Sequence, residues 1–574
     1  MKATRSELVG SIWYQKQKHR YADFNFFLVS NMKPFLILCS SFFVITHLLV
    51  NCSPSPSSPS SDLGYNLSSI QSLCKSTPYP ELCYDSFTLS DFVKNICPNH
   101  LALLQHSLQT ALSEAGKLSN HFSISQPNIV ETQKGTLQDC NDLHVITISS
   151  LKKSVSRVNS ILSSTNLDDA RAYLSAALTN KYTCLEGLDS ASGSSKLPLI
   201  TSMINAYKHV SNALSLLPSK SGGTSSLSQM RRRLMGFPRW ISTKGRRILE
   251  GSDSEYNSSN VLTVAIDGTG NFTSLADAIK FTPNNSMYKI FIYVKEGIYH
   301  ENVDIPSSKP NIVLIGDGRN VTVISSNRSV GNGWTTFKSA TVAVSGEGFL
   351  ARDITFENTA GPEKHQAVAL RVNADSAAIY RCTIKGYQDT LYVHSFRQFY
   401  RECDIYGTID FIFGNAAVVF QECNIFSRLP MPHQFTVITA QSRDAPYEYT
   451  GISIQNCSIL PDIDLLDKNS TTVRSFLGRP WKNYSTTVIM RSYIDDHIAP
   501  EGWRSWSDGN NNSIRSLYYG EYDNIGPGSV TDNRVNWPGY HKMNDLDASN
   551  FTASEFITAG EWLNSTFFPY YDGI

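Results

Sequence analysis

The hydrophobic positions follow two different periods in the two halves of the chain. Between residues 63 and 218 apolar residues recur every three or four positions, as in LDDARAYLSAALTNKYTCLEGL (167–188), and Gly and Pro are scarce. Such spacing places the apolar side chains on one face of a helix. Several helices of this kind within one segment predict an all-α helical bundle over residues 63–218.

Beyond residue 258 the pattern changes to short runs of Val, Ile, Phe, Tyr and Thr separated by Gly, Asn and Asp, as in KIFIYVKEGIYHENV (289–303). These runs are typical of strands. A Cys-x-Ile unit recurs at Cys382, Cys403, Cys423 and Cys457, and the first three follow one another at nearly equal intervals. A repeat of roughly twenty residues indicates stacked units that bury their faces on one another. We therefore expect an all-β parallel β-helix over residues 250–574.

The repeat predicts which side chains lie one above the other. Equivalent residues on successive rungs are about 4.8 Å apart, the spacing of paired strands. Cys403 and Cys423 would then lie within the roughly 4.4–6.8 Å that a disulfide requires between Cα atoms. The sequence predicts this bridge; the alternative is a ladder of buried free thiols.

The same interval brings polar residues together. Gln366 precedes Gln388 in GYQDTLY (386–392) by about one repeat, and Asp389 precedes Asp410 in DFIFGN (410–415) by the same step. On three adjacent rungs these four side chains would converge on one face. Three aromatic residues are expected to line the groove around them: Tyr392, Phe411 and Phe413.

Such a cluster suits acid–base and nucleophilic chemistry. Two neighbouring carboxyls cannot both ionise easily, so one keeps its proton while the other is a nucleophile or base. Arg479 in LGRPW (477–481) could decide which one ionises, and Trp481 could stack on a sugar. Gln amides can stabilise an oxyanion. Taken singly, each Asp could merely cap a turn, and no metal-ligand cluster or cofactor motif accompanies the set.

The N-terminus suggests export. A basic leader (1–33) precedes an apolar segment (34–52) that we interpret as a signal peptide or signal-anchor, followed by a Ser/Pro linker (53–62). Translation from Met32 instead of Met1 would give an ordinary signal peptide. Asn-x-Ser/Thr sequons are frequent after residue 60, which is typical of a secreted glycoprotein; examples are Asn66, Asn257, Asn271, Asn320, Asn327, Asn469 and Asn564.

A basic linker (219–249) separates the two halves. It contains RRRLM (231–235) and GRRILE begins within it at residue 245. We interpret it as a site for a processing protease, the alternative being a solvated linker. Residues 1–249 carry 25 Lys and Arg against 14 Asp and Glu, a charge of +11, and residues 250–574 carry 25 against 36, a charge of −11. Opposite charges indicate two modules that attract each other, and neither half has the pattern of a nucleic-acid binder.

Five motifs carry a resemblance to a known family. GIYHE (297–301), HQAVALR (365–371), GYQDTLY, DFIFGN and LGRPW resemble, in family order, the signatures of plant pectin methylesterases. Residues 63–218 resemble the pectin methylesterase inhibitors, which are four-helix bundles with two disulfides. This implies pairing of Cys74 with Cys83 and of Cys140 with Cys184, and it leaves Cys97 without a partner. The whole chain is similar to precursors in which an inhibitor-like pro-region precedes the enzyme, a right-handed parallel β-helix.

The resemblance implies a role for each site residue. Asp410 matches the nucleophile, Asp389 the proton donor and base, and Gln388 the transition-state stabiliser assisted by Gln366. Arg479 matches the residue that holds the nucleophile. Positions that match substrate-binding residues are the following: Thr336, Gln366, Arg479 and Trp481. Cys403 and Cys423 match the family disulfide.

These observations predict a secreted, monomeric cell-wall enzyme that needs no metal or cofactor. It would hydrolyse the methyl esters of homogalacturonan (pectin), and the bundle would inhibit it until the linker is cut. One alternative is another β-helix enzyme acting on pectin, a polygalacturonase or a lyase. A second is a binding protein, in which the bundle inhibits other enzymes in trans; the esterase itself could also meet separate inhibitor proteins.

Overall fold

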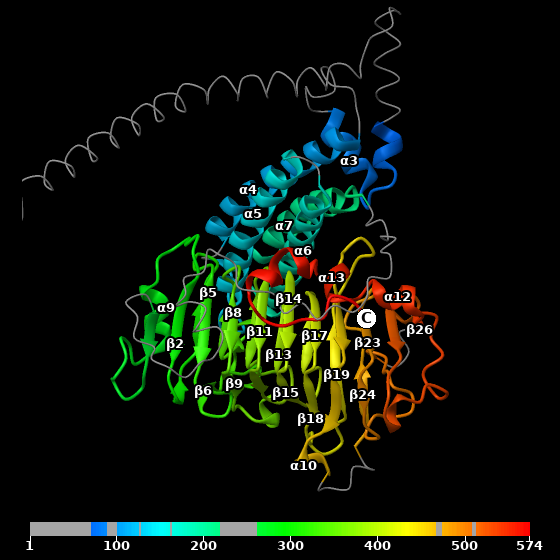
Figure 1. Cartoon of the computed structure of the whole chain (residues 1–574). Helices are drawn as coiled ribbons and strands as arrows, with labels where there is room; N and C mark the ends of the chain where they lie inside the picture. Colours follow the sequence, from blue (N-terminus) through cyan, green and yellow to red (C-terminus); the bar gives the residue numbers. More distant parts are fainter. Residues whose placement is uncertain are drawn as a thin grey trace, which may run out of the picture. The chain divides into compact units, whose positions relative to one another are not determined.

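A computed structural model describes residues 70–88, 100–125, 128–160, 163–218, 261–466, 473–507 and 513–574 (Figure 1). The described residues within 73–87 and from 100 onward form one compact unit, which contains both helices and sheets. The predicted leader, apolar segment, Ser/Pro linker and basic processing linker lie outside the described residues, as do Cys97 and the alternative start at Met32. Among the residues that are described, no helix is long and apolar enough to cross a membrane.

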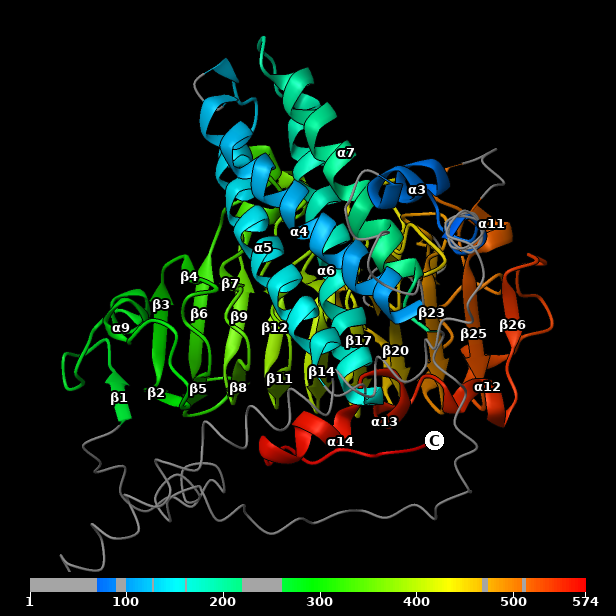
Figure 2. The same cartoon turned by 90° about the horizontal axis from the view of Figure 1, so that it is seen from above.

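Four long helices follow one another in the N-terminal half and lie side by side (Figure 2). They are α4 (His100–Ser125), α5 (Thr136–Asn159), α6 (Ser164–Ser190) and α7 (Lys196–Ser215), preceded by the shorter α3 (Pro80–Thr88). Helix α6 begins where the side chain of Ser163 accepts a hydrogen bond from the backbone N–H of Asn166, a typical N-cap. The predicted bundle is confirmed.

Both disulfides expected in the bundle are present. Cys74 is bonded to Cys83 at the start of the helical region. Cys140 of α5 is bonded to Cys184 of α6, across 44 residues of chain. A cross-link over a loop of this length restricts the unfolded chain and contributes roughly 3–4 kcal/mol to stability.

The C-terminal half is a right-handed parallel β-helix made of three sheets. The first sheet has eleven strands in the order β1 (Val261–Val264), β2 (Ile290–Val294), β5 (Ile312–Gly316), β8 (Leu350–Arg352), β11 (Ala377–Tyr380), β14 (Arg397–Arg401), β17 (Ala417–Gln421), β20 (Gly451–Gln455), β23 (Thr486–Met490), β25 (Tyr518–Tyr522) and β26 (Tyr540–Lys542). The second, called the seven-stranded sheet below, runs β4 (Val303–Ile305), β7 (Val342–Val344), β10 (Leu370–Asn373), β13 (Leu391–Ser395), β16 (Ile412–Gly414), β19 (Thr436–Gln441) and β22 (Ser475–Gly478). The third runs β3 (Gly297–His300), β6 (Thr322–Ser326), β9 (Thr355–Asn358), β12 (Thr383–Lys385), β15 (Asp404–Gly407), β18 (Asn424–Ser427), β21 (Ser458–Pro461) and β24 (Tyr493–Ile494).

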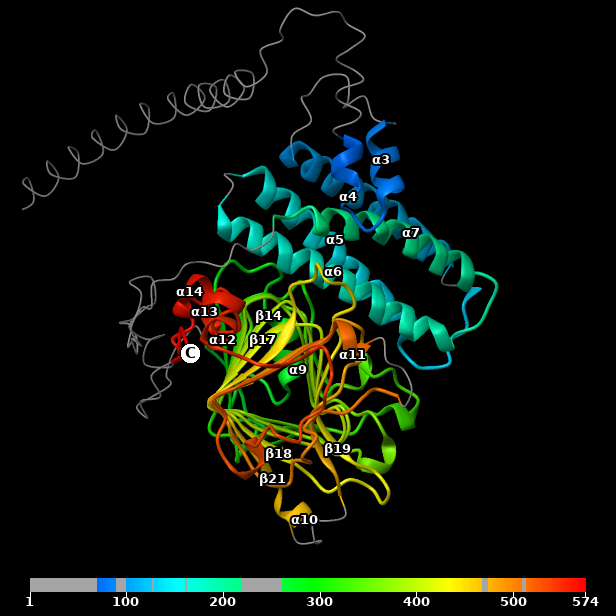
Figure 3. The same cartoon turned by 90° about the vertical axis from the view of Figure 1, so that its right-hand side faces the viewer.

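The three sheets form the walls of one stack, which Figure 3 shows from its end. Alternate residues of each strand point inward, so Leu370, Leu391 and Ile412, which are paired in register, fill the interior. Short helices accompany the stack: α9 (Leu275–Phe281), α10 (Ile463–Leu466), α11 (Ser513–Ser516), α12 (Asp545–Ser549), α13 (Ala553–Phe556) and α14 (Ala559–Trp562).

The GIYHE motif has a structural task. The carboxylate of Glu301 accepts hydrogen bonds from the backbone N–H groups of Leu275 and Ala276, at 2.8 and 3.0 Å, and from the hydroxyl of Ser274. It therefore satisfies the unpaired donors at the start of α9, where a negative charge is favourable. This fixes the first rungs of the β-helix to the helix beside them.

The predicted cysteine stack is present, but the predicted bridge between Cys403 and Cys423 is wrong. Strands β12, β15, β18 and β21 are paired in register, so the Cys residue before each of them falls on the same line. All four cysteines are buried free thiols. Each Sγ lies 3.3–3.5 Å from the carbonyl oxygen two residues earlier in its own rung. Every rung gives its cysteine the same orientation, so neighbouring thiols of the stack interact with one another as well as with the backbone carbonyls, but no S–S bond joins them.

Candidate active site

The outer face of the seven-stranded sheet carries the aromatic part of the site. Arg371, Tyr392, Phe413 and Ala440 are paired in register on neighbouring strands. The rings of Tyr392 and Phe413 are stacked, with centroids 4.1 Å apart. Because the side chains alternate along each strand, these residues point outward while their neighbours fill the core.

Asp389 and Asp410 stand at the same place on adjacent rungs, each two residues before a strand of this sheet. The backbone N–H of Asp389 donates to the carbonyl of Ile409 at 3.0 Å, which ties the two turns together. Both residues have a left-handed backbone, with φ of 61° and 53°. Strained backbone of this kind is common at functional sites, where it directs a side chain. The prediction that the two carboxyls lie on adjacent rungs is confirmed.

Arg479 contacts Asp410 through two hydrogen bonds. Its Nε donates to Oδ1 at 2.8 Å and its Nη2 to Oδ2 at 2.5 Å. The backbone N–H of Arg479 donates to the carbonyl of Thr439, so the last strands of the sheet fix its position. The guanidinium also lies 4.2 Å from the ring centroid of Trp506. A planar, paired contact of this kind holds a carboxylate in one orientation.

The two carboxyls differ in charge state because their neighbours differ. Burial raises the pKa of Asp389 well above its usual value, and the adjacent Asp410 raises it further. Burial also raises the pKa of Asp410, but the hydrogen bonds and charge of Arg479 oppose that rise. Asp389 is therefore the carboxyl that keeps a proton, and Asp410 is the carboxylate that Arg479 stabilises.

The remaining predicted residues line one cavity of about 290 Å³ with the two aspartates: Thr336, Gln366, Gln388, Arg479 and Trp481. The rungs of Gln366 and Gln388 are adjacent, since the backbone N–H of Ala367 donates to the carbonyl of Gln388. Trp481 is stacked on Trp506 at 6.4 Å between centroids and lies 6.0 Å from Phe413. The structure brings every β-helix residue that was predicted for catalysis or substrate binding into this cavity.

The cavity also has a wall that the sequence did not predict. Residues of the helical bundle complete its lining: Gln133, Thr136, Asp139, Thr183, Glu186 and Gly187. The hydroxyl of Thr335 donates to Oδ2 of Asp139 at 2.5 Å, and the hydroxyl of Thr183 lies 2.9 Å from Nε2 of His394. With the bundle in this position, Asp389 and Asp410 are only 8% and 5% exposed. The bundle thus covers the groove that holds the candidate catalytic residues.

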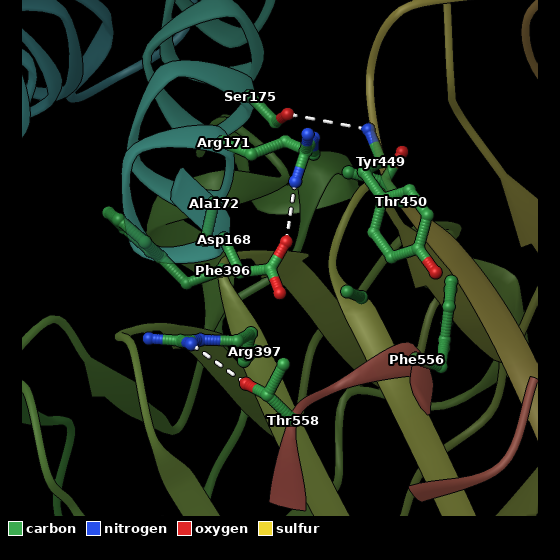
Figure 4. A pocket seen from close by; sticks show the side chains of 11 residues that line it. Asp168, Arg171, Ala172, Ser175, Phe396, Arg397, Tyr449, Thr450, Phe556 and Thr558 are labelled. Atoms are coloured by element: carbon green, nitrogen blue, oxygen red, sulfur yellow. Dashed lines mark hydrogen bonds and ion pairs between the residues drawn. The ribbon is translucent and has the colours of Figure 1, made fainter. Parts of the chain in front are cut away.

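A second contact area joins the bundle to the β-helix, and Figure 4 shows it from close by. Arg397 of β14 donates to Asp375 of the β-helix and to Asp169 of α6, each at 2.7 Å. The backbone N–H of Tyr449 lies 3.5 Å from the hydroxyl of Ser175. A cavity of about 20 Å³ remains there, room for about one water.

The sequence did not predict Phe337 and Trp506 as site residues, and its assignment of Phe411 to the groove was wrong. Phe411 is fully buried in the interior of the β-helix and lines no groove. Phe337 takes its place, packed against the outer row of the sheet. The contact of Trp506 with Arg479 was also missed, because the two residues belong to segments without a repeat. Within the described residues, no group of three His, Cys, Asp or Glu side chains could hold a metal ion.

A parallel β-helix with this site defines a class of carbohydrate esterases, and comparison with known proteins identifies the family. Residues 261–561 match the pectinesterase family model, and residues 68–216 match the plant invertase/pectin methylesterase inhibitor model. The chain belongs to the pectinesterase family, and its N-terminal region is of the inhibitor type.

Relatives and a solved structure agree with this assignment. Probable pectinesterase/pectinesterase inhibitor 12 of Arabidopsis thaliana is 61% identical over 520 residues, covering 88% of this chain and 94% of the relative. Probable pectinesterase/pectinesterase inhibitor 7 of the same plant is 42% identical over 570 residues, covering 88% and 96%. The structure of pectin methylesterase from carrot is 48% identical with a TM-score of 0.54, covering 56% of this chain and all of the carrot chain.

Proposed function

We propose that residues 250–574 hydrolyse methyl esters of homogalacturonan to methanol and free carboxylates, and that residues 63–218 block this reaction until the linker is cut. The observation that carries the proposal is the paired contact of Arg479 with Asp410, one rung from a carboxyl that keeps its proton. This arrangement supplies a nucleophile and an acid in one cavity. The pectinesterase family assignment favours an ester over the glycosidic bond that a polygalacturonase or a lyase would attack.

In the first half of the reaction, an oxygen of Asp410 attacks the ester carbonyl carbon. The carbonyl oxygen becomes an oxyanion, which the amide N–H groups of Gln388 and Gln366 stabilise. The intermediate collapses as the bond to the methoxy oxygen breaks, and Asp389 gives its proton to that oxygen so that methanol leaves. An anhydride between Asp410 and the galacturonate remains.

In the second half, the deprotonated Asp389 takes a proton from water. The resulting hydroxide attacks the carbonyl carbon of the anhydride, a second oxyanion forms at the same place, and Asp410 leaves as a carboxylate. Asp389 again carries a proton. Arg479 returns Asp410 to its starting orientation, and Thr336 and Trp481 hold the sugar chain.

The cover formed by the bundle supports the inhibitory role. A polymer cannot reach the two aspartates while Asp139, Thr183 and Glu186 line the same cavity. We propose that a protease cuts within residues 219–249 and so allows the bundle to leave. The opposite charges of the two halves of the chain favour their association before the cut.

The remaining assignments are proposals of the same kind. Residues 34–52 would direct export to the cell wall, either as a signal peptide or as a temporary anchor, and the mature enzyme would act as a monomer without a cofactor. Asn320 and Asn327 are exposed sequons on the β-helix, which supports glycosylation. After cleavage the bundle could also inhibit other copies in trans, and separate inhibitor proteins could bind the same groove.

Methanol release from methylated pectin tests the proposal. The β-helix domain is expected to fold alone, because the carrot enzyme corresponds to this domain over its whole length. Residues 250–574 should release methanol, Asp410→Ala should not, and the uncut chain should be slower than the domain. Loss of pectin chain length without methanol would refute the esterase assignment, and equal rates for the uncut chain and the domain would refute inhibition.

A further inference from the structure

Trp503 is a buried ring that packs against the chain just before Arg479. It belongs to the interior cluster of the β-helix. Its backbone forms a parallel bridge with Gly478, the residue that precedes Arg479. A methyl group added at Gly478 would lie 3.0 Å from a ring carbon of Trp503, too close for a normal contact, and would collide with Oγ1 of Thr439. The chain therefore passes between these two side chains without room for a β-carbon.

Two backbone hydrogen bonds join the segment around this ring to the end of strand β22. The N–H of Leu477 donates to the carbonyl of Gly502 at 2.7 Å, and the N–H of Arg504 donates to the carbonyl of Gly478 at 3.0 Å. Strand β22 ends at Gly478, so these bonds hold the last peptide groups before Arg479. The direction in which the Arg479 side chain leaves the backbone is set by this support.

A buried ion pair holds the ring of Trp503 in one orientation. Arg534 donates from Nε and Nη2 to the two carboxylate oxygens of Glu521, at 2.8 and 3.1 Å, and both side chains are almost fully buried. The indole N–H of Trp503 donates to Oε1 of the same carboxylate at 3.1 Å. Arg534 also donates to the carbonyls of Pro500 and Gly528. Burying two charges costs free energy that apolar side chains would not, and this pair fixes both the ring and the segment that carries it.

Tyr519 connects the same ring to the catalytic site from the interior side. The ring centroids of Trp503 and Tyr519 are 4.3 Å apart, and Tyr519 is fully buried. The pKa of Tyr519 is raised well above its usual value, by burial first and then by the charge of Asp410, whereas Arg479 opposes the rise. The two stacked rings therefore lie within electrostatic reach of the pair that Arg479 forms with Asp410.

We propose that Trp503 is a positioning residue for the pair of Arg479 with Asp410. The ion pair of Glu521 with Arg534 keeps the ring in place, and the ring supports the chain so that the guanidinium meets both carboxylate oxygens at once. The inference rests on the esterase function proposed above, and it adds residues that tune the nucleophile without touching the substrate or the reacting atoms. Such support matters because a displacement of about 1 Å at a catalytic group can lower a rate about 10²-fold.

Another pair of interior rings provides a matched comparison. Tyr400 of β14 and Phe420 of β17 are stacked with centroids 4.8 Å apart. The hydroxyl of Tyr400 donates to Gln398 of its own strand at 3.0 Å. Strands β14 and β17 belong to the eleven-stranded sheet, whereas Gly478 ends a strand of the seven-stranded sheet. Substitution of Phe420 therefore removes interior packing without changing the support before Arg479.

Kinetics of methanol release from methylated pectin by residues 250–574 test the positioning role. Trp503→Phe keeps an aromatic ring but loses the indole N–H and leaves space beside Gly478. We expect kcat to fall about tenfold while KM stays within twofold. Because the contact of Arg479 with Asp410 loosens, the acid side of the profile of kcat/KM against pH should move upward by about half a unit. Phe420→Leu should lower the unfolding temperature to a similar extent and leave kcat and the profile unchanged.

A double-variant cycle with Arg479→Lys separates positioning from a loss of stability. If Trp503 acts through Arg479, Trp503→Phe should change kcat less than about twofold when Arg479→Lys is already present. A tenfold loss in both backgrounds, or a rate equal to that of Phe420→Leu, would refute the positioning role.

Arg534→Lys provides the same test if Trp503→Phe does not fold. The lysine keeps the charge but cannot make both hydrogen bonds to Glu521, so kcat should fall about threefold, and only while Arg479 is present. An equal loss in the Arg479→Lys background would again refute the inference. If wild type releases no methanol, the esterase assignment fails together with this inference, whereas an active wild type with additive effects refutes this inference alone.

Discussion

Asp410 and Asp139 are both buried carboxyls facing a cation in the same cavity, yet their partners are held in different ways. Asp410 and Arg479 belong to the same sheet, and Arg479 reaches both carboxylate oxygens. Asp139 belongs to the bundle, and Lys338 approaches it only to 3.9 Å. Burial raises the pKa of Asp139 to about 7, although Thr335, Lys338 and Arg371 oppose that rise.

The pair of Asp410 with Arg479 is therefore a permanent ion pair, whereas the contact of Asp139 with Lys338 is removable. The Asp410 pair is positioned by the β-helix itself, so it remains when the bundle leaves. The Asp139 contact exists only in the docked state, and burying this carboxyl costs free energy that its partners do not fully return. Docking is therefore sensitive to changes that leave the catalytic pair intact.

The largest effect is expected from removing the permanent pair. Asp410→Asn abolishes the nucleophile and should reduce methanol release by residues 250–574 by about 10⁴-fold or more. Asp404→Asn, on the same rung but in the third sheet, is the matched control and should keep wild-type activity. Thermal unfolding of both variants checks that the β-helix remains folded. Residual activity of Asp410→Asn within tenfold of wild type would exclude Asp410 as the nucleophile.

A smaller effect is expected when the charge of the pair is kept but its geometry is lost. Arg479→Lys cannot make two parallel hydrogen bonds, so kcat should fall about 10²-fold. Because Arg479 lowers the pKa of Asp410, the variant should also need a higher pH to ionise the nucleophile. The acid side of the profile of kcat/KM against pH should move upward. A profile that stays in place would show that Arg479 only binds substrate.

The removable contact should respond to pH within the uncut chain. Below about pH 4 the Asp139 carboxyl is protonated in both the docked and the released bundle. Between about pH 4 and 7 the docked form keeps the proton and the released form has lost it, so each pH unit weakens docking by about 1.4 kcal/mol. Above about pH 7 the Asp139 carboxyl is ionised in both forms, and docking weakens no further with pH. The facing groups are Asp142, Asp304, Thr335, Lys338 and Arg371.

The measurable quantity is the rate of the uncut chain divided by the rate of residues 250–574. We expect this ratio to rise by up to about 10² from pH 5 to pH 7 at fixed salt. Asp139→Asn has no carboxyl to titrate and should flatten the rise, whereas Asp85→Asn, elsewhere in the bundle, should keep it. A ratio that falls with pH would contradict the raised pKa of Asp139.

The repeat made most of the β-helix predictable from the sequence. The nearly constant interval between rungs determined the register of Asp389 with Asp410, because a stack requires equivalent residues to align. The orientation of Phe411 was not predictable in the same way. A shift of one residue sends a side chain to the opposite face of a strand, and the pattern DFIFGN fits both possibilities.

The wall that the bundle adds to the site could not be predicted. The motifs around Asp389 and Arg479 lie within single rungs, and spacing is sufficient to place them. The contacts of Asp139 and Thr183 join segments far apart in the sequence without a shared period. Opposite net charges predicted that the halves associate, but net charge carries no information on which faces meet.

The smallest expected effect concerns the cysteines, which differ between the two regions. The bundle has two disulfides, whereas the β-helix has four buried thiols bonded to backbone carbonyls. Residues 250–574, denatured without reductant, should therefore show four titratable thiols per chain, whereas a bridge between Cys403 and Cys423 would leave two.

Reductant should lower the unfolding temperature of the bundle in the uncut chain and leave the unfolding temperature of the β-helix unchanged. Cys403→Ala should cost the β-helix only about 1–2 kcal/mol, the effect of losing one buried sulfur rather than a cross-link. Two thiols and a reductant-sensitive β-helix would restore the bridge that the repeat predicts.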